Sequence, residues 1–202
     1  FLQMASNSTA GTPLDLWFTA GKNIQPQTCD QYAVGYFRNF MNNRLEASVE
    51  VFYKNMKNTI DFRDHAQLLL NRKLDGELRF GDSQAYGAEF QIQKNMGKLT
   101  GWVSYTYSRT ERTIQGVNNN ETYLAPYDRP HTVYIVANYD LNEHISFGAN
   151  FIYASGQPVT YPIARMEVGN VILPVYSKRN EYRMPDYHRM DVSLTWKPKH
   201  NL

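Results

Sequence analysis

The sequence has almost no cysteine and almost no net charge. Its 202 residues include one cysteine, Cys29, which excludes an internal disulfide framework and any metal site built from several cysteines. The 21 Lys and Arg residues nearly balance the 19 Asp and Glu residues, and a net charge of +2 gives no indication of a nucleic-acid partner. The five histidines lack metal-ligand spacing, so the sequence predicts no metal site.

Long apolar runs are also missing. No stretch of about 18 apolar residues is present, so the sequence predicts no transmembrane helix. The first residues, Phe1 to Ser6, lack the basic region and apolar core of a signal peptide, and we expect a processed or truncated piece of a longer chain. A mean hydropathy of -0.56 fits a soluble protein, but it also fits a membrane β-barrel, whose strands are only half apolar.

Alternation of apolar and polar side chains dominates the chain. Between Arg44 and Lys54, for example, Leu45, Val49 and Val51 share one face, and mostly polar side chains share the other. Most such segments reach roughly the 9–11 residues that a tilted strand needs to cross a bilayer. The best helical candidate, residues 64–70, is short. The predicted strands are 31–40, 44–54, 85–94, 98–109, 131–140, 144–156 and one around 191–196, with Phe1 to Ser6 as the end of another.

The connections between these strands are of two kinds. Tight hairpins with Asn or Gly at the turn are predicted at 41–43, 95–97 and 141–143. Long loops are predicted at 55–84, 110–130 and 157–185. Because short and long connections alternate, an antiparallel meander places all the short turns at one end and all the long loops at the other. This asymmetry is typical of outer-membrane barrels, whose short turns are periplasmic and whose long loops lie outside.

Two folds explain the alternation, a soluble β-sandwich and a membrane barrel. One face of segments 45–53, 99–107 and 145–153 is free of charge, as contact with lipid requires. The opposite face carries Glu46, Glu50 and Glu89, which would be costly in a sandwich core and suit a wet lumen. We therefore predict that these three carboxylates belong to a lumen-facing wall, while both folds remain open on the pattern alone.

A series of local motifs lies along the chain: PQ at 26–27, DQYAVGY at 30–36, EASVEVFYK at 46–54, AYGAE at 85–89, GWVSYTYS at 101–108, YDRPH at 127–131, GQP at 156–158 and RMPDYHRMD at 183–191. Together they cover nearly the whole chain and resemble the strand starts, strand ends and loop returns of TonB-dependent outer-membrane receptors, in the form found in Bacteroidetes. The resemblance implies an all-β, antiparallel up-and-down meander of about seven or eight strands, which is the C-terminal part of a larger, 22-stranded transmembrane barrel.

The resemblance also implies a function and a set of partners. Such receptors import a scarce nutrient (a siderophore, haem, cobalamin or an oligosaccharide) across the bacterial outer membrane by energised transport. The implied partners are outer-membrane lipid, the receptor's own plug domain and remaining strands, the TonB complex acting through that plug, and in some receptors a surface lipoprotein. No cofactor is implied, because iron or cobalamin would be cargo. Leu202 is not the terminal aromatic residue usual in this family, so we expect that 1–202 is a partial barrel segment without plug or last strands.

The long loops supply the candidate ligand-binding residues. Arginine and tyrosine on outside loops suit an anionic or glycan ligand or a surface lipoprotein, and contact with lipopolysaccharide phosphates or neighbouring loops is the alternative. No catalytic group is predicted, since Ser155 lacks the context of a nucleophile elbow. The remaining alternatives are an outer-membrane porin, a barrel enzyme or a soluble sandwich that serves as a binding module. The candidate ligand-binding residues are Tyr123, Tyr127, Arg129, Tyr161, Arg165 and Arg179.

Overall fold

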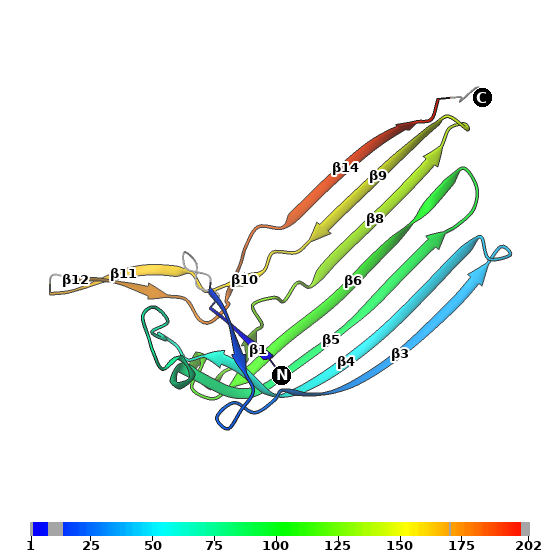
Figure 1. Cartoon of the computed structure of the whole chain (residues 1–202). Helices are drawn as coiled ribbons and strands as arrows, with labels where there is room; N and C mark the ends of the chain where they lie inside the picture. Colours follow the sequence, from blue (N-terminus) through cyan, green and yellow to red (C-terminus); the bar gives the residue numbers. More distant parts are fainter. Residues whose placement is uncertain (1, 8–13, 170, 199–202) are drawn as a thin grey trace.

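The computed structural model describes residues 2–7, 14–169 and 171–198, and its main feature is one antiparallel sheet (Figure 1). Seven long strands form a meander in which each long strand pairs with the next long strand of the chain, and the short β7 pairs with the edge of β6. The predicted all-β meander is therefore confirmed. In sheet order the strands are β14 (Tyr187–Trp196), β9 (Ile145–Ala154), β8 (His131–Asp140), β6 (Leu99–Ile114), β5 (Leu78–Lys94), β4 (Leu45–Phe62) and β3 (Thr28–Phe40), with β7 (Tyr123–Leu124) beside β6.

Three small two-stranded sheets and two short 3-10 helices complete the described part of the chain. None of its helices is long and apolar enough to cross a membrane. The small sheets pair β1 (Leu2–Asn7) with β2 (Leu14–Thr19), β10 (Pro158–Val159) with β13 (Tyr182–Arg183), and β11 (Pro162–Val168) with β12 (Val171–Tyr176); the 3-10 helices are η1 (Leu74–Glu77) and η2 (Asn118–Asn120).

Short turns join the long strands at one end of the sheet. Met41, Asn42 and Asn43 all have left-handed backbone conformations, with φ between 53° and 63°, and link β3 to β4. Gly97, with φ of 102°, lies in the turn between β5 and β6, where a side chain would be strained. Asparagine and glycine tolerate positive φ better than other residues, so these turns form where the sequence has them.

At the other end, β4, β5 and β6 run further than the sequence suggests. β4 continues to Phe62 and β5 begins at Leu78, so the predicted loop 55–84 is wrong in extent and contains only residues 63–77 outside the two strands. β6 similarly continues to Ile114. The alternation is hidden there because β4 carries one extra residue between Met56 and Thr59, where the pairing register with β5 shifts.

The short helical candidate at 64–70 does not form a helix in the structure. His65 and Leu70 both have positive φ, 56° and 57°, and a right-handed helix cannot contain such residues in its interior. The segment consists of turns and irregular backbone. At the N-terminus, Leu2 to Ser6 belong to a strand as expected, but it pairs with β2, which the sequence did not predict. Phe1, His200 and Leu202 lie outside the described residues.

The register of the sheet aligns one apolar row after another. Val49 lies opposite Tyr36 on one side and Phe90 on the other, and the same row continues across the sheet. Each row joins side chains of the face that is predicted to contact lipid. The six members of this row from β3 to β9 are Tyr36, Val49, Phe90, Tyr105, Val133 and Tyr153; the next row contains Ala47, Ile92, Val103, Ile135, Phe151 and Met190.

The opposite face of the same sheet is polar. Glu50 lies directly opposite Glu89, and Glu46 lies opposite Gln93 and accepts a hydrogen bond from Asn95 at 2.8 Å. Two carboxylates on adjacent strands repel each other unless water or a cation separates them. The pairing of Glu50 with Glu89 therefore fits a hydrated surface better than the core of a sandwich.

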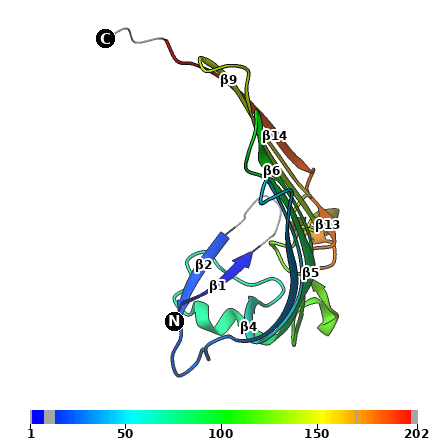
Figure 2. The ribbon, with the colours of Figure 1, turned by 90° about the vertical axis from the view of Figure 1, so that its right-hand side faces the viewer.

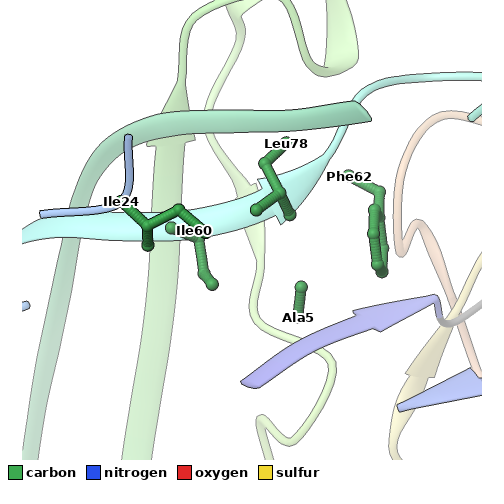
Figure 3. Close-up of a cluster of buried hydrophobic side chains, with 5 residues drawn as sticks. All are labelled: Ala5, Ile24, Ile60, Phe62 and Leu78. Atoms are coloured by element: carbon green, nitrogen blue, oxygen red, sulfur yellow. The ribbon is translucent and has the colours of Figure 1, made fainter. Parts of the chain in front are cut away.

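The hairpin β1–β2 packs on the sheet near its long-loop end. Figure 2 shows it on one side of the sheet, and Figure 3 shows Ile60, Phe62 and Leu78 directed toward Ala5 of β1. Ala5 and Phe62 are almost fully buried, and the rings of Phe62 and Phe18 meet edge to face with centroids 6.0 Å apart. This small apolar cluster is the hairpin's attachment to β4 and β5.

An arginine on the apolar face tests the assignment of the two faces. We expect Phe90→Arg to destabilise the intact protein in membranes by about 2–4 kcal/mol, because this row lies well inside the apolar band. Gln91→Arg, the control one residue along β5, points to the carboxylate-bearing face and should change stability by less than about 0.5 kcal/mol. Urea unfolding in lipid vesicles, followed by heat-modifiable electrophoretic migration, measures both; equal effects of the two variants would contradict the assignment.

Candidate functional site

An extra residue in β4 changes which of its side chains share a face of the sheet with Ser83 of β5 and Arg112 of β6. Asn58, with φ of 58°, lies within the register shift between Met56 and Thr59. Up to Met56, the even-numbered residues of β4 share a face with Ser83 of β5. After the shift, Thr59 and Asp61 take that face instead. Asp61 is thereby turned toward the side of the sheet that also carries Arg112 of β6, which lies opposite Ser83.

Asp61 accepts hydrogen bonds from three segments of the chain. Its Oδ2 accepts one from Arg112 Nη1 at 3.2 Å and one from the Tyr123 hydroxyl at 2.7 Å. Its Oδ1 accepts one from Arg179 Nη2 at 2.6 Å and one from the Phe62 backbone N–H at 2.7 Å. A single carboxylate therefore joins β4, β6, β7 and the loop that precedes β13.

This group of ions is removed from water. Asp61 has no exposed surface, and the Arg112 and Arg179 side chains are 6% and 7% exposed. The Nε atoms of both arginines have no hydrogen-bond partner, so the guanidinium groups depend on Asp61 for most of their stabilisation. Removing the carboxylate would leave two buried cations without their shared counter-charge.

Tyr123 completes the group around Asp61. Burial raises the pKa of its hydroxyl well above the usual value, and the charge of Asp61 and the hydrogen bond to it raise the pKa further. The hydroxyl therefore stays protonated and remains a donor. Ile114 and Val117, which are both fully buried, pack with the Tyr123 ring and hold it in place.

Further contacts tie the same loops together. Asn118 donates its backbone N–H to Asp64 at 2.8 Å, and its side-chain oxygen accepts the Arg179 backbone N–H at 3.0 Å. Asn180 donates to the Leu124 carbonyl at 2.6 Å. At the surface, Lys178 and Glu121 form an ion pair at 2.8 Å. We call the three segments joined in this way, residues 61–64, 112–124 and 178–180, the loop cluster.

A second set of contacts fixes the corners where the long loops return to the sheet. Asp128, which is buried, pairs with Arg183 and accepts the Thr110 backbone N–H at 2.6 Å. Asp186 accepts the Tyr153 hydroxyl at 2.6 Å and the Gly156 N–H at 2.9 Å. These two donors lower the pKa of Asp186, so its carboxylate remains charged at neutral pH.

A cavity of about 430 Å³ lies beside the loop cluster. It is the size of a small-molecule site, and its lining combines apolar, aromatic, cationic and amide groups. Arg63 at its edge is held by Glu77 at 2.6 Å. Its other lining residues are Phe62, Asp64, His65, Ala66, Leu68, Asn118, Asn119, Thr160, Tyr176, Ser177, Lys178 and Arg179.

The structure does not gather the six predicted ligand-binding residues at one site. Tyr123 and Arg179 are brought together, but both are buried on Asp61, so their polar groups serve the loop cluster. Tyr127 is half exposed, and its ring lies under the Arg112 guanidinium. Arg129 is partly buried at the return to the sheet, where its carbonyl accepts the Ser108 hydroxyl. Tyr161 packs against Tyr182, and Arg165 is exposed on β11.

Sequence reasoning missed Asp61 and most of the cavity. Asp61 has no motif around it, and its role depends on the register shift at Asn58. Ser155 is buried and accepts the His131 backbone N–H, which is a structural contact. Within the described ranges, no three His, Cys, Asp or Glu side chains gather as a metal site would require, and Cys29 is exposed.

A single antiparallel sheet with one apolar and one polar face, short turns at one end and ordered loops at the other, defines a segment of a membrane β-barrel. The chain belongs to the TonB-dependent receptor family: the model of the TonB dependent receptor-like β-barrel matches residues 2–202. This family consists of outer-membrane transport receptors rather than enzymes. Membership in it excludes the alternative of a soluble sandwich.

One solved structure supports the same fold. The chain is similar to the ferric-catecholate import receptor Fiu from E. coli K12 in its closed form, with a TM-score of 0.57 and 17% sequence identity. The match covers 99% of this chain and 26% of that receptor, so the chain spans about a quarter of its length. No curated protein sequence matches the chain significantly.

Asparagine in place of Asp61 should open the loop cluster. We expect Asp61→Asn to destabilise the loops by about 3–5 kcal/mol, because it leaves the buried Arg112 without a carboxylate partner and the buried Arg179 with only Asp64, at 4.0 Å. Limited trypsin digestion of the intact protein in membranes should then cut faster after Lys178 and Arg179, while the barrel stays heat-modifiable. Asp82→Asn, an exposed carboxylate on β5, is the control. Equal cleavage of both variants would show that Asp61 does not hold the loops.

Alkaline pH provides an independent test of Tyr123. Its pKa is raised in the folded state, so its contribution to stability is complete below about pH 10, the pKa of an unfolded tyrosine, and is lost as the pH rises above it. By pH 11, the wild type should have lost about 1.4 kcal/mol of unfolding free energy that the Tyr123→Phe variant does not lose. Urea unfolding at pH 9 and pH 11 compares the two proteins, and an equal loss of unfolding free energy between these pH values would contradict this role of Tyr123.

Proposed function

We propose that this chain forms part of the barrel wall and surface loops of a receptor in the bacterial outer membrane that imports a scarce nutrient by energised transport. The observation that supports this proposal is the two-faced sheet, whose two central apolar rows each continue across six of the seven long strands, in a chain of the TonB-dependent receptor family. The barrel supplies the channel, and a plug domain closes it until the TonB complex acts on that plug.

In this proposal the polar face of the sheet is the lumen wall. Glu46, Glu50 and Glu89 then face the plug and the water around it. The long-loop end faces the exterior, where the loop cluster holds the cavity-lining residues in a fixed arrangement before any ligand arrives. Such preorganisation reduces the entropy that a ligand-binding loop loses on binding.

The lining of the cavity indicates the general chemistry of the nutrient. Its lining offers an aromatic ring at Tyr176, donors at Asn119 and Lys178, and an apolar side at Leu68. These groups suit a ligand with both polar and aromatic or apolar parts, which fits a siderophore better than a bare ion. Ferric catecholates, imported by the similar receptor of E. coli K12, are the first ligands to test, followed by haem, cobalamin and oligosaccharides.

Uptake by cells tests the proposal. The intact protein is produced in iron-starved cells without their own catecholate receptors, and uptake of radioactive iron is measured with and without a working TonB. We expect surface binding in both strains and accumulation only with TonB. Accumulation independent of TonB would identify a porin, and chemical conversion of the ligand would identify an enzyme; either outcome contradicts the proposal.

A tyrosine variant tests the contribution of the cavity. Tyr176→Ala should raise the ligand concentration for half-maximal uptake about 3–10-fold, which corresponds to the loss of one aromatic contact. Tyr32→Ala removes a tyrosine from the apolar face of β3 and should leave this concentration unchanged. If both variants behave as the wild type, the ligand contacts lie elsewhere in the receptor.

A further inference from the structure

One cation lies within the apolar face of the sheet, in a row that is otherwise uncharged. Arg38 of β3 is exposed and lies opposite Ala47, which lies opposite Ile92. The row continues through Val103 without another charge. A charged side chain among lipid-facing residues is unfavourable unless its charged group can reach the membrane interface.

The Arg38 side chain does run toward that interface. Its guanidinium carbon lies 5.0 Å from the centre of the Phe40 ring, and Phe40 is two residues nearer the short-turn end of the sheet. The aliphatic part of the side chain therefore covers apolar surface, while the charge is displaced toward the turns. The ring of Phe40 contributes a cation–π contact but no negative charge.

A second cation lies on the same face near the short-turn end, on the other side of β4. Lys94 of β5 is exposed and belongs to the same face, because it lies opposite Leu45, which lies opposite Phe40. Its ammonium group donates to the Leu99 carbonyl at 2.9 Å, beyond the end of the strand. β3 and β5 are two strand spacings apart, or about 10 Å, so both side chains can reach one group between them once the Lys94 ammonium turns from Leu99 on β6 toward β4.

Neither cation has an acidic partner among the residues that the structure describes. The described ion pairs involve other side chains, and the nearby Glu46 points to the opposite face, where it accepts a hydrogen bond from Asn95. The pair therefore presents two positive charges, an aromatic ring and Leu45 at the edge of an apolar surface. This combination matches the anionic headgroup and upper acyl chains of a phospholipid.

We propose that Arg38 and Lys94 form a binding site for the phosphate of an anionic phospholipid in the membrane leaflet at the short-turn end. This inference rests on the proposed placement of the chain in the outer membrane, where short turns are periplasmic. Arg38 binds the phosphate with its planar guanidinium group, Lys94 contributes a point charge, and the acyl chains lie along Leu45 and Ile92. The bound lipid supplies a counter-charge that the described residues do not provide at this position.

Lipid titration followed by native mass spectrometry tests the site. The intact protein, delipidated in mild detergent, is titrated with phosphatidylglycerol and with phosphatidylcholine of the same acyl chains. We expect tighter binding of the anionic lipid to the wild type, and binding about tenfold weaker in the double variant Arg38→Gln and Lys94→Gln, because each cation near an anionic lipid contributes several-fold. Phosphatidylcholine binding should change much less.

Two further variants make the result specific. Lys57→Gln removes a lysine of β4 that is exposed at the long-loop end and has no ion pair with the described residues. This variant should keep the wild-type preference for the anionic lipid. The exchange of Arg38→Lys with Lys94→Arg keeps both charges and should retain most of the preference. Should the double glutamine variant fail to fold, each single glutamine variant is expected to weaken binding about threefold. An unchanged preference in folded glutamine variants overturns the site.

The outcome also separates this inference from the proposed function. A wild-type protein that inserts into vesicles and supports TonB-dependent uptake, but shows no dependence of lipid binding on Arg38 and Lys94, would overturn the lipid site alone. A wild-type protein that does not insert into vesicles as a heat-modifiable barrel would overturn both the outer-membrane placement and the lipid site.

Discussion

The structure depends on one constraint. Each strand must have one face that suits hydrocarbon and one that suits water, and neighbouring strands must pair in the register that keeps like faces on the same side of the sheet. A shift of one residue between two strands would exchange the faces and place Glu50 or Glu89 among the apolar rows. The backbone ladder alone does not select a register. It is selected because only one register keeps Val49, Phe90 and Tyr105 in a single row, while tight turns at one end limit how far a strand can slide.

Where the strands extend beyond the apolar band, their faces must match other protein segments instead of lipid and water. β4, β5 and β6 carry their extra residues at the long-loop end, and there the two faces are covered by protein instead of lipid and lumen water. The register shift at Asn58 sets which side chains of β4 point to each side of the sheet. Ile60 and Phe62 contact the hairpin β1–β2, while Asp61 contacts Arg112, Arg179 and Tyr123 on the other side. One additional residue thus supplies both an apolar attachment and an ionic one.

The two ends of the sheet serve different purposes in the proposed receptor. At the long-loop end, buried charges satisfy each other inside the protein, which favours one arrangement of the loops around a cavity. At the short-turn end, the charges of Arg38 and Lys94 find no counter-charge in the described residues and are directed to the membrane interface. The same residue type therefore has opposite roles, since Arg179 is stabilised by a carboxylate and Arg38 by its access to headgroups.

Much of this arrangement is visible in the sequence, because alternation with a period of two is a local property. The seven long strands, the turns rich in Asn and Gly, and the division of side chains between two faces all follow from neighbouring residues. The family resemblance rests on the same kind of information, since motifs such as DQYAVGY lie within single strands. The lumen-side assignment of Glu46, Glu50 and Glu89 stays a prediction, although the register does place the three on one face.

The loop cluster could not be predicted in this way. Tyr123 and Arg179 were singled out because they are tyrosine and arginine on long loops, yet the structure buries both on Asp61, which lies 118 residues before Arg179. The irregular backbone at 64–70, with positive φ at His65 and Leu70, is likewise not visible in the local pattern. The sequence by itself determined the seven long strands, their two faces and the alternation of short and long connections, because these depend on residues one or two positions apart. Only the tertiary structure decided the shift at Asn58 and the partners of Asp61, because a buried charge takes its partners from whatever segments the fold brings within hydrogen-bond distance.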